Sequence, residues 1–251
     1  MKVAISQPTY LPWLGYFDLI DQVDAFVFLD SVQFEKRSWQ QRNRIKTPAG
    51  LQWLTVPVAF PGGLRQSIKD VEIREPNFWR KHLRAIELNY RRSPFFHTYF
   101  PDLSSLRRSF PAGSLLVDLN VGLIEWFMKV LCLRTPLLRS SSMKQEGKRT
   151  ELLANICQSL GAKLYLSPLG SAAYLLDEKQ AFSDRGIDVA FQHYEHPEYG
   201  QQFPPFCPYA SVVDLLFNEG DRSLHILRSG RKTPFLPEDV AVRAGEETKA
   251  G

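Results

Sequence analysis

The sequence predicts an α/β protein with a mainly parallel sheet, and three observations favour this class. Short apolar runs of strand length recur near both ends of the 251-residue chain, each followed by a turn signal. Segments with helical spacing of apolar residues separate these runs, and an alternation of strands and helices is typical of parallel sheets. Hydrophobic residues make up 44% of the chain, which is enough to fill a core at this length.

The N-terminal segment has the pattern of a strand–helix–strand unit. A buried strand is expected over Lys2–Ser6, because this apolar run ends at a Gln-Pro turn signal. The apolar residues of Tyr16–Val23 share one face of a helix, and a second apolar strand follows over Ala25–Leu29, closed by Asp30. A crossover of this length favours parallel pairing of the two strands.

The middle of the chain is expected to contain a β-hairpin and then a helical insertion. Two polar or alternating runs flank the turn signal Thr47–Gly50, which predicts the hairpin. Apolar residues spaced in fours then indicate helices. The elements expected are hairpin strands at 40–46 and 51–58, an irregular loop at 60–63, and helices at 77–91 and 115–131, the second started by Ser114.

The last third returns to alternating strands and helices. The elements expected are a short strand at 136–140, a helix at 148–160 stopped by Gly161, a strand at 163–166, a helix near 174–184, a strand at 187–191, an aromatic and proline-rich loop at 197–208, and a helix at 211–218 capped by Ser211. Without a repeat or a strong linker, we expect a single α/β domain of Rossmann-like type over 1–230, with a helical middle region at about 76–135 and a polar tail at 231–251.

Several classes of protein are excluded by composition. No run of about 18 apolar residues exists, so no membrane span is expected. The N-terminal apolar stretch is too short for a signal peptide. The three cysteines, Cys132, Cys157 and Cys207, are far apart and predict neither a zinc knuckle nor a disulfide framework. We therefore expect a cytoplasmic protein.

The charges are distributed unevenly along the chain. Lys and Arg total 31 and Asp and Glu total 27, so the net charge is only +4. Seven basic residues and no acidic residue nevertheless lie between Lys36 and Lys69, directly after an acidic segment that ends at Glu35. This basic stretch is either a solvated face or a binding site for phosphate, carboxylate or nucleic acid.

The segments that follow the two N-terminal strands are the first candidates for a binding site, because ligands of open parallel sheets bind beyond the carboxyl ends of the strands. In the first segment Gln7 and Tyr10 are polar groups among prolines and aromatics, which otherwise only cover the core. In the second, Asp30 and Gln33 are candidates to orient a substrate. Asp30 would bind a ribose hydroxyl or act as a base, or else it bonds its own loop backbone.

The basic side chains after the second strand suit an anion. Arginine pairs its N–H groups with carboxylate and phosphate oxygens. Alternate residues of a strand share one face, so Arg42, Arg44 and Lys46 would together contact a nucleotide diphosphate. The alternative is an exposed strand face. The candidates within these eleven residues are Lys36, Arg37, Arg42, Asn43, Arg44 and Lys46.

The segment His193–Tyr199 follows the last expected strand and offers groups for proton transfer. His196 is a candidate general acid or base because the histidine pKa lies near neutrality, although an ordinary loop histidine is the alternative. Cys207 with His196 would form a nucleophile for acyl transfer, whereas a small buried cysteine is the commoner case. Asp214 and Asn218 share a helix face. The spacing of histidines and carboxylates matches no strong metal motif, so we expect no metal and no cofactor.

Several motifs resemble the WbqC-like protein family. They are the runs Gln7–Phe17, Asp30–Arg37, Arg42–Lys46, Trp53–Val58, Tyr165–Ser167, Tyr174–Leu175, His196–Tyr199 with Gln201, and Asp214–Gly220. This bacterial group is largely uncharacterised and has members in gene clusters for O-antigen and other surface polysaccharides. The resemblance implies modification of a sugar, or transfer of an amino acid or acyl group, and adds Tyr199 and Gln201 as candidates for substrate binding.

A weaker resemblance links Val3–Ile20 to the opening of HIGH-motif nucleotidylyl transferases. The two histidines of that motif are missing here, since the corresponding places are near Pro12 or Trp13 and at Tyr16. A nucleotide-binding relative with altered catalysis remains compatible with this pattern.

Three functions compete at this point. The first is a transferase for a nucleotide-linked sugar or an activated acyl or aminoacyl donor, with the two N-terminal loops and His196 around one pocket for an anionic small molecule. The second is a nucleic-acid or anion-binding module, in which Trp39, Trp53 and Phe34 would stack bases. The small net charge and the lack of an RNA-binding motif argue against nucleic acid. The third is a scaffold in a polysaccharide assembly.

Overall fold

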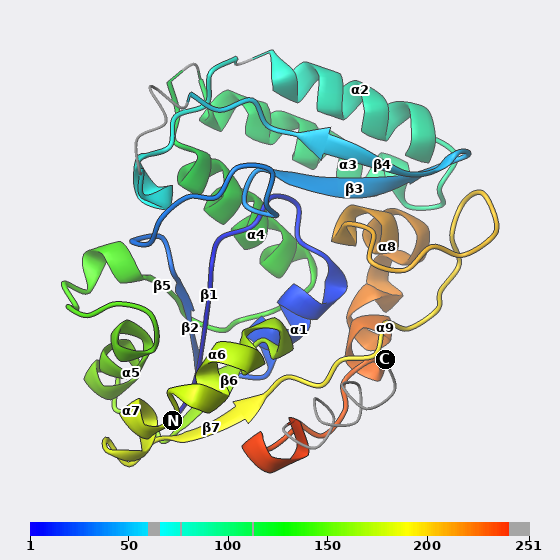
Figure 1. Ribbon diagram of the computed structural model, residues 1–251. Coiled ribbons are helices and arrows are strands. Elements are labelled where there is room, and N and C mark those ends of the chain that lie inside the picture. Colours follow the sequence, from blue (N-terminus) through cyan, green and yellow to red (C-terminus); the bar gives the residue numbers. More distant parts are fainter. Residues whose placement is uncertain (60–65, 76, 112, 241–251) are drawn as a thin grey trace, which may run out of the picture.

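A five-stranded parallel sheet forms the centre of the computed structural model, which describes residues 1–59, 66–75, 77–111 and 113–240 (Figure 1). The strand order is β5-β2-β1-β6-β7. The strands are β1 (Lys2–Ser6), β2 (Ala25–Phe28), β5 (Leu137–Arg139), β6 (Leu164–Ser167) and β7 (Asp188–Phe191). The chain proceeds outward from β1 through β2 to β5, and then returns to the other side of β1 for β6 and β7. This confirms the predicted α/β class with a parallel sheet of Rossmann-like type.

The alternating side chains of the strands separate the core into two layers, one on each face of the sheet. Ala4 of β1 and Phe26 of β2 belong to the larger apolar cluster. Val3 of β1 and Val27 of β2 point to the opposite face and belong to a second cluster. Both faces of the sheet are therefore buried, which explains why its strands are continuous apolar runs rather than alternating ones.

Each face of the sheet is covered by its own helices. The larger cluster includes residues of α1 (Leu14–Asp21), α4 (Leu116–Val130), α8 (Val212–Glu219) and α9 (Ser223–Ser229). The second cluster includes residues of α5 (Thr150–Ser159), α6 (Ala172–Asp177) and α7 (Gln180–Ser183). No helix in the described ranges combines the length and the apolarity that crossing a membrane requires.

The predicted hairpin is present as β3 (Arg42–Thr47) and β4 (Gly50–Thr55), paired antiparallel. It lies beside α2 (Phe78–Tyr90), and the helical region also contains α3 (Phe96–Ser105). Figure 1 shows the hairpin and α2 at the end of the molecule far from the N-terminus, so the hairpin lies on the side toward which β1 runs. The backbone N–H of Ser211, just before α8, donates to the carbonyl of Arg44 and ties the hairpin to the domain.

Most element boundaries agree with the sequence within a few residues, and the differences have local causes. The N-cap of α4 is Leu115 rather than Ser114, whose hydroxyl donates to the Pro111 carbonyl instead. The helix expected near 174–184 is divided into α6 and α7, because Glu178 leaves the helical conformation at φ −111°. Helix α3 lies within the helical middle region expected at about 76–135, although it was not expected as a separate element. The loop expected at 60–63 lies outside the described residues.

The segment after Gly230 differs from the polar tail that we expected there. Up to residue 240 it packs against the sheet rather than extending away from it. Phe235 and Val240 are buried in the second apolar cluster, and Phe235 exchanges backbone hydrogen bonds with Phe191 of β7. Arg231 forms ion pairs with Asp18 and Asp21 of α1. Two buried apolar side chains and the two ion pairs of one arginine are too weak a signal to be recognised in a polar, proline-containing sequence.

Candidate functional site

A cavity of about 300 Å³ lies where the strand order reverses, between the carboxyl ends of β1 and β6. Ser6 at the end of β1, Pro168 directly after β6 and Gln192 directly after β7 contribute to its lining. The complete lining is Ser6, Thr9, Trp13, Gly15, Tyr16, Leu19, Trp39, Asn43, Arg44, Pro168, Gln192 and Tyr209. We refer to it below as the switch-point cavity. Its size suits a small molecule or one part of a larger ligand.

Aromatic rings form much of the wall of the switch-point cavity. Trp13, at the N-cap of α1, meets Tyr209 edge to face with ring centroids 5.4 Å apart. The indole also packs directly over Gly15, where an added Cβ would lie 2.3 Å from the ring. Only glycine permits this approach, so the sequence at the start of α1 fixes the position of the indole. Rings of this kind offer flat surfaces for a base, a sugar or another planar group.

Arg44 is the charged residue among those that line the cavity. It lies on β3 directly opposite Trp53, and its guanidinium is 5.3 Å from the Trp53 ring centre and 5.4 Å from that of Trp39. No described carboxylate is within ion-pair distance of it, and its buried Nε has no hydrogen-bond partner within the described part of the chain. The two indoles therefore position a cation whose charge no carboxylate of the described residues neutralises.

Arg42 differs from Arg44 in position although both share the outer face of β3. Its guanidinium lies 4.2 Å from the centre of the Trp53 ring, and its Nε is likewise buried without a described partner. Arg42 does not line the switch-point cavity, whereas Asn43 does. The Asn43 side-chain amide donates to the Leu11 carbonyl, and its oxygen accepts from the Arg44 backbone N–H. Asn43 thus holds the first loop against the hairpin.

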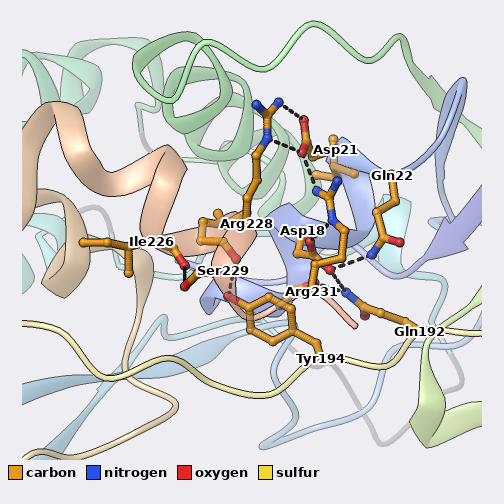
Figure 2. A network of polar contacts seen from close by, with 12 residues as sticks. Asp18, Asp21, Gln22, Gln192, Tyr194, Ile226, Arg228, Ser229 and Arg231 are labelled. Carbon is orange, nitrogen blue, oxygen red and sulfur yellow. Dashed lines mark hydrogen bonds and ion pairs between the residues drawn. The ribbon is translucent and has the colours of Figure 1, made fainter. Parts of the chain in front are cut away.

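Gln192 contributes a polar group to the cavity and is held by a charged network (Figure 2). Its side-chain nitrogen donates to the Gly15 carbonyl at 2.8 Å and to Asp18 at 2.7 Å. Within the described residues no hydrogen bond reaches Gln192 Oε1, which leaves this oxygen as an acceptor for a ligand. Asp18 is completely buried and also pairs with Arg231.

The network in Figure 2 fixes α1 to the end of α9 and to the segment after it. Burial raises the pKa of Asp18 above its usual range, although Arg231 and Gln192 lower it through hydrogen bonds. For Asp21, burial also raises the pKa, but hydrogen bonds and charges from Arg228 and Arg231 outweigh it and the pKa is lowered. The pairing of two arginines with two aspartates therefore holds the helix that carries one wall of the cavity.

Asp30 is buried after β2, on the other side of β1 from Gln192, which follows β7. Its carboxylate accepts from Arg139 Nε at 2.7 Å, from the Ser140 hydroxyl, and from both the N–H and the hydroxyl of Ser141. Burial alone would raise the pKa of Asp30, but Arg139 and Ser141 lower it below its usual range. These four bonds occupy the lone pairs of the carboxylate. Asp30 is therefore better suited to join β2 to the segment after β5 than to accept a proton from a substrate. Asp30 is not among the residues that line the cavity.

Three other predicted residues gather around a second buried carboxylate, that of Asp214. Tyr199 and Gln201 both donate to Asp214 Oδ2, at 2.8 and 2.7 Å, and the Tyr90 hydroxyl donates to Oδ1. Burial raises the pKa of Asp214, although these donors and the nearby charge of Lys46 lower it. Lys46 itself is 2% exposed and donates to the Pro205 carbonyl and to Cys207 Sγ. The structure thus brings Lys46, Tyr199 and Gln201 together, beside the switch-point cavity rather than in its wall.

The remaining candidates of the first two loops lie elsewhere. Tyr10 is completely buried and its hydroxyl is 2.8 Å from His82 Nδ1. Gln7 Oε1 accepts from the side chain of Gln40. Gln33, Lys36 and Arg37 are exposed, and the structure does not bring them to the lining of the cavity.

His196 lies behind the aromatic wall of the cavity. Its ring stacks on Trp13 with centroids 6.2 Å apart and meets Tyr209 at 5.3 Å. Burial lowers the pKa of His196, so the neutral ring is favoured. Nδ1 is 3.0 Å from the Pro197 carbonyl and must donate to it, which leaves Nε2 as an acceptor; Nε2 is buried and has no described partner. His196 therefore has the protonation state of a base. The two rings that it contacts line the cavity, but His196 itself does not.

Several lining residues were not identified from the sequence. Gln192 and Pro168 each come directly after a strand, so the same rule that drew attention to Asp30 applies to them equally. Tyr209 lies in a loop far from any strand end, and no local pattern distinguishes it. Trp39, three residues before β3, was considered only as a ring that would stack a base. In the described part of the chain, no three His, Cys, Asp or Glu side chains are placed to hold a metal ion.

Comparisons with known proteins place this architecture in a family. The chain is 37% identical over 232 residues to a protein of Mycobacterium tuberculosis (strain ATCC 25618 / H37Rv) named "Uncharacterized protein Rv1507c", covering 92% of this chain and 99% of that protein. No solved structure matches the chain significantly. The model of the WbqC-like protein family matches residues 7–226, a range that contains nearly all of the cavity lining. The chain belongs to the WbqC-like protein family.

Proposed function

We propose that this protein is a cytoplasmic transferase that binds a nucleotide-linked sugar, or an activated acyl or aminoacyl donor, in the switch-point cavity. The observation that carries the proposal is Arg44, a cation without a described carboxylate partner, held by two indoles at the edge where α/β sheets bind ligands. Phosphate oxygens suit the N–H groups of a guanidinium. A role in surface polysaccharide biosynthesis, such as that of O-antigen, rests on the family resemblance alone.

The lining suggests a role for each part of a donor. A base or sugar ring would stack on Trp13 or Trp39, while the phosphate or carboxylate contacts Arg44. Gln192 Oε1 would accept a hydrogen bond from a hydroxyl or amide of the ligand, since the side-chain nitrogen is already committed. His196 would accept the proton of the attacking group through Nε2, which requires that the side chain of Trp13 or Tyr209 moves aside.

A thermal-shift screen of the full chain tests this proposal. The probes are UDP-N-acetylglucosamine, acetyl-coenzyme A and glycine, each added to the protein and to its Arg44→Ala variant. A ligand at about 100 times its Kd stabilises the folded state by about 2.7 kcal/mol, or about 5–10 °C in a chain of this size. We expect such a shift with at least one anionic probe, and its loss in the variant. A shift that is equal in both proteins contradicts the assigned anion site.

A second candidate is a binding or scaffold protein without catalysis. One observation favours it: the lining residues include no Asp, Glu, His, Cys or Lys side chain that would carry out proton transfer or nucleophilic attack directly. Binding of an intact donor without turnover, followed over hours by chromatography of the donor, would support this candidate over the transferase.

A further inference from the structure

The side chains of Lys46 and Cys207 lie close together, and neither of them lines the switch-point cavity. Lys46 Nζ lies 2.9 Å from Cys207 Sγ, although the two residues are 161 positions apart. This separation falls within the range of N–H···O hydrogen bonds, about 2.7–3.2 Å, even though sulfur is a larger atom than oxygen. The nitrogen and the sulfur are therefore closer than an ordinary hydrogen bond to sulfur requires.

The buried carboxylate of Asp214 fixes both members of this pair. On one side, the Lys46 backbone N–H donates to the Tyr90 hydroxyl, which donates to Asp214. On the other side, Gln201 donates both to Asp214 and to the Cys207 carbonyl, and accepts from the Cys207 N–H. Each backbone is thus anchored to the same group, and the Pro205 carbonyl accepts from Lys46 Nζ beside the sulfur.

The surroundings of the pair limit what can react there. Lys46 is 2% exposed, whereas Cys207 is partly exposed and is a free thiol. Neither residue lines the switch-point cavity. A small oxidant such as hydrogen peroxide reaches a partly exposed thiol of this kind.

We propose that Lys46 and Cys207 are a site of oxidative cross-linking, in which one oxygen atom joins the lysine nitrogen to the cysteine sulfur. Two molecules of hydrogen peroxide serve as the oxidant. The S–H bond of Cys207 and two N–H bonds of the Lys46 ammonium break, and one S–O and one O–N bond form. Sulfur and nitrogen each lose two electrons, and the two peroxide O–O bonds accept all four. The products are the bridge, three water molecules and one proton.

The bridge would join β3 to the loop before α8. Arg44 is two residues before Lys46, and Tyr209 is two residues after Cys207, so both flanking residues line the switch-point cavity. Oxidation would therefore fix two walls of the cavity relative to each other. The proposed cross-link depends only on the pair itself, and it stands or fails independently of which ligand the cavity binds.

Mass spectrometry of the full chain tests the proposal. The reduced protein is treated with hydrogen peroxide, digested without a reductant and mapped. We expect a peptide containing Lys46 joined to one containing Cys207, heavier than the sum by one oxygen and lighter by two hydrogens, which dithiothreitol separates. Cleavage by trypsin after Lys46 is lost in the same fraction. Exposed Cys132 serves as the comparison within the same chain, since simple oxidation adds one, two or three oxygens to a thiol.

The variant Lys46→Arg retains a positive charge but lacks the amine, and Cys207→Ser lacks the sulfur. Both should lose the cross-linked peptide, with Cys207 of the first variant oxidised to sulfinic acid instead. Circular dichroism shows whether each variant remains folded, but the decisive result comes from the unaltered protein. If peroxide gives only oxygenated Cys207, or leaves Cys207 unmodified while Cys132 is oxidised, the proposed cross-link is wrong.

Discussion

Replacing Arg44 with alanine removes the charge from the switch-point cavity and leaves its apolar walls in place. The side chain is held by contacts with the Trp39 and Trp53 rings, at 5.4 and 5.3 Å, rather than by an ion pair with a described carboxylate. The substitution therefore leaves no buried carboxylate without a partner. The structural cost is restricted to the two cation–π contacts, about 0.5–1 kcal/mol each at exposed rings.

The effect on binding should be larger than the effect on stability. A hydrogen bond to a charged group contributes about 1.5–3 kcal/mol, so loss of one such contact raises Kd by about 10- to 150-fold. Isothermal titration calorimetry with the anionic probe that gives the largest thermal shift measures this change directly. Because the contact is ionic, the difference between wild type and variant should decrease as the salt concentration rises.

Arg42→Ala is the matched control for this experiment. Arg42 lies on the same strand face and contacts Trp53 more closely than Arg44 does, at 4.2 Å, but it does not line the cavity. Arg42→Ala should therefore reduce stability by about as much as Arg44→Ala does. It should change Kd by less than about threefold, which is the effect expected when an exposed charge far from the ligand is removed. Equal weakening of binding by both variants would refute the assignment of the anion to the cavity.

Three further predictions concern the framework of the site. Burial lowers the pKa of His82 to about 4 from 6.5, so the stability contributed by the neutral ring is complete above pH 6.5 and is lost as the pH falls from there to about 4. The free energy of unfolding measured in urea should decline at up to about 1.4 kcal/mol per pH unit in this window, and His82→Phe should remove this slope. Arg231→Ala leaves buried Asp18 without its ion pair and should cost about 3–5 kcal/mol in urea unfolding. Arg228→Ala, at a half-exposed side chain, should cost less than about 1 kcal/mol, and equal costs would contradict the burial argument. Gly15→Ala forces the indole above it out of place and should lower Tm by an amount equivalent to about 1–3 kcal/mol, whereas an unchanged Tm would show that the wall adapts freely.

The fold could be predicted because its strands carry a local signal. A parallel strand covered on both faces is a continuous apolar run, and Ala25–Phe28 has no exposed residue at all. The hairpin was indicated by its turn residues. The N-cap of α8 was indicated by Ser211, whose hydroxyl accepts from the Val213 N–H. Each of these signals is contained within a few neighbouring residues.

The candidate site could be predicted only in part, because its roles depend on partners far away in the chain. The sequence shows that Asp30 ends a strand, but not that Arg139, 109 residues later, occupies its carboxylate. The sequence also predicts that Arg44 and Lys46 share one face of a strand. It does not show that Lys46, unlike Arg44, donates to the Pro205 carbonyl and to Cys207. The two basic residues thus have different environments for a reason that no local pattern contains. The grouping of His196 with the other predicted residues stays a prediction.

A crystal structure of the protein with its best-bound anionic probe tests the central claim most directly. We predict that the probe occupies the space between Trp13, Trp39 and Pro168, with its phosphate or carboxylate within hydrogen-bond distance of the Arg44 guanidinium. A probe bound outside the switch-point cavity, for example on the exposed face around Arg42, with the cavity left empty, would contradict the account.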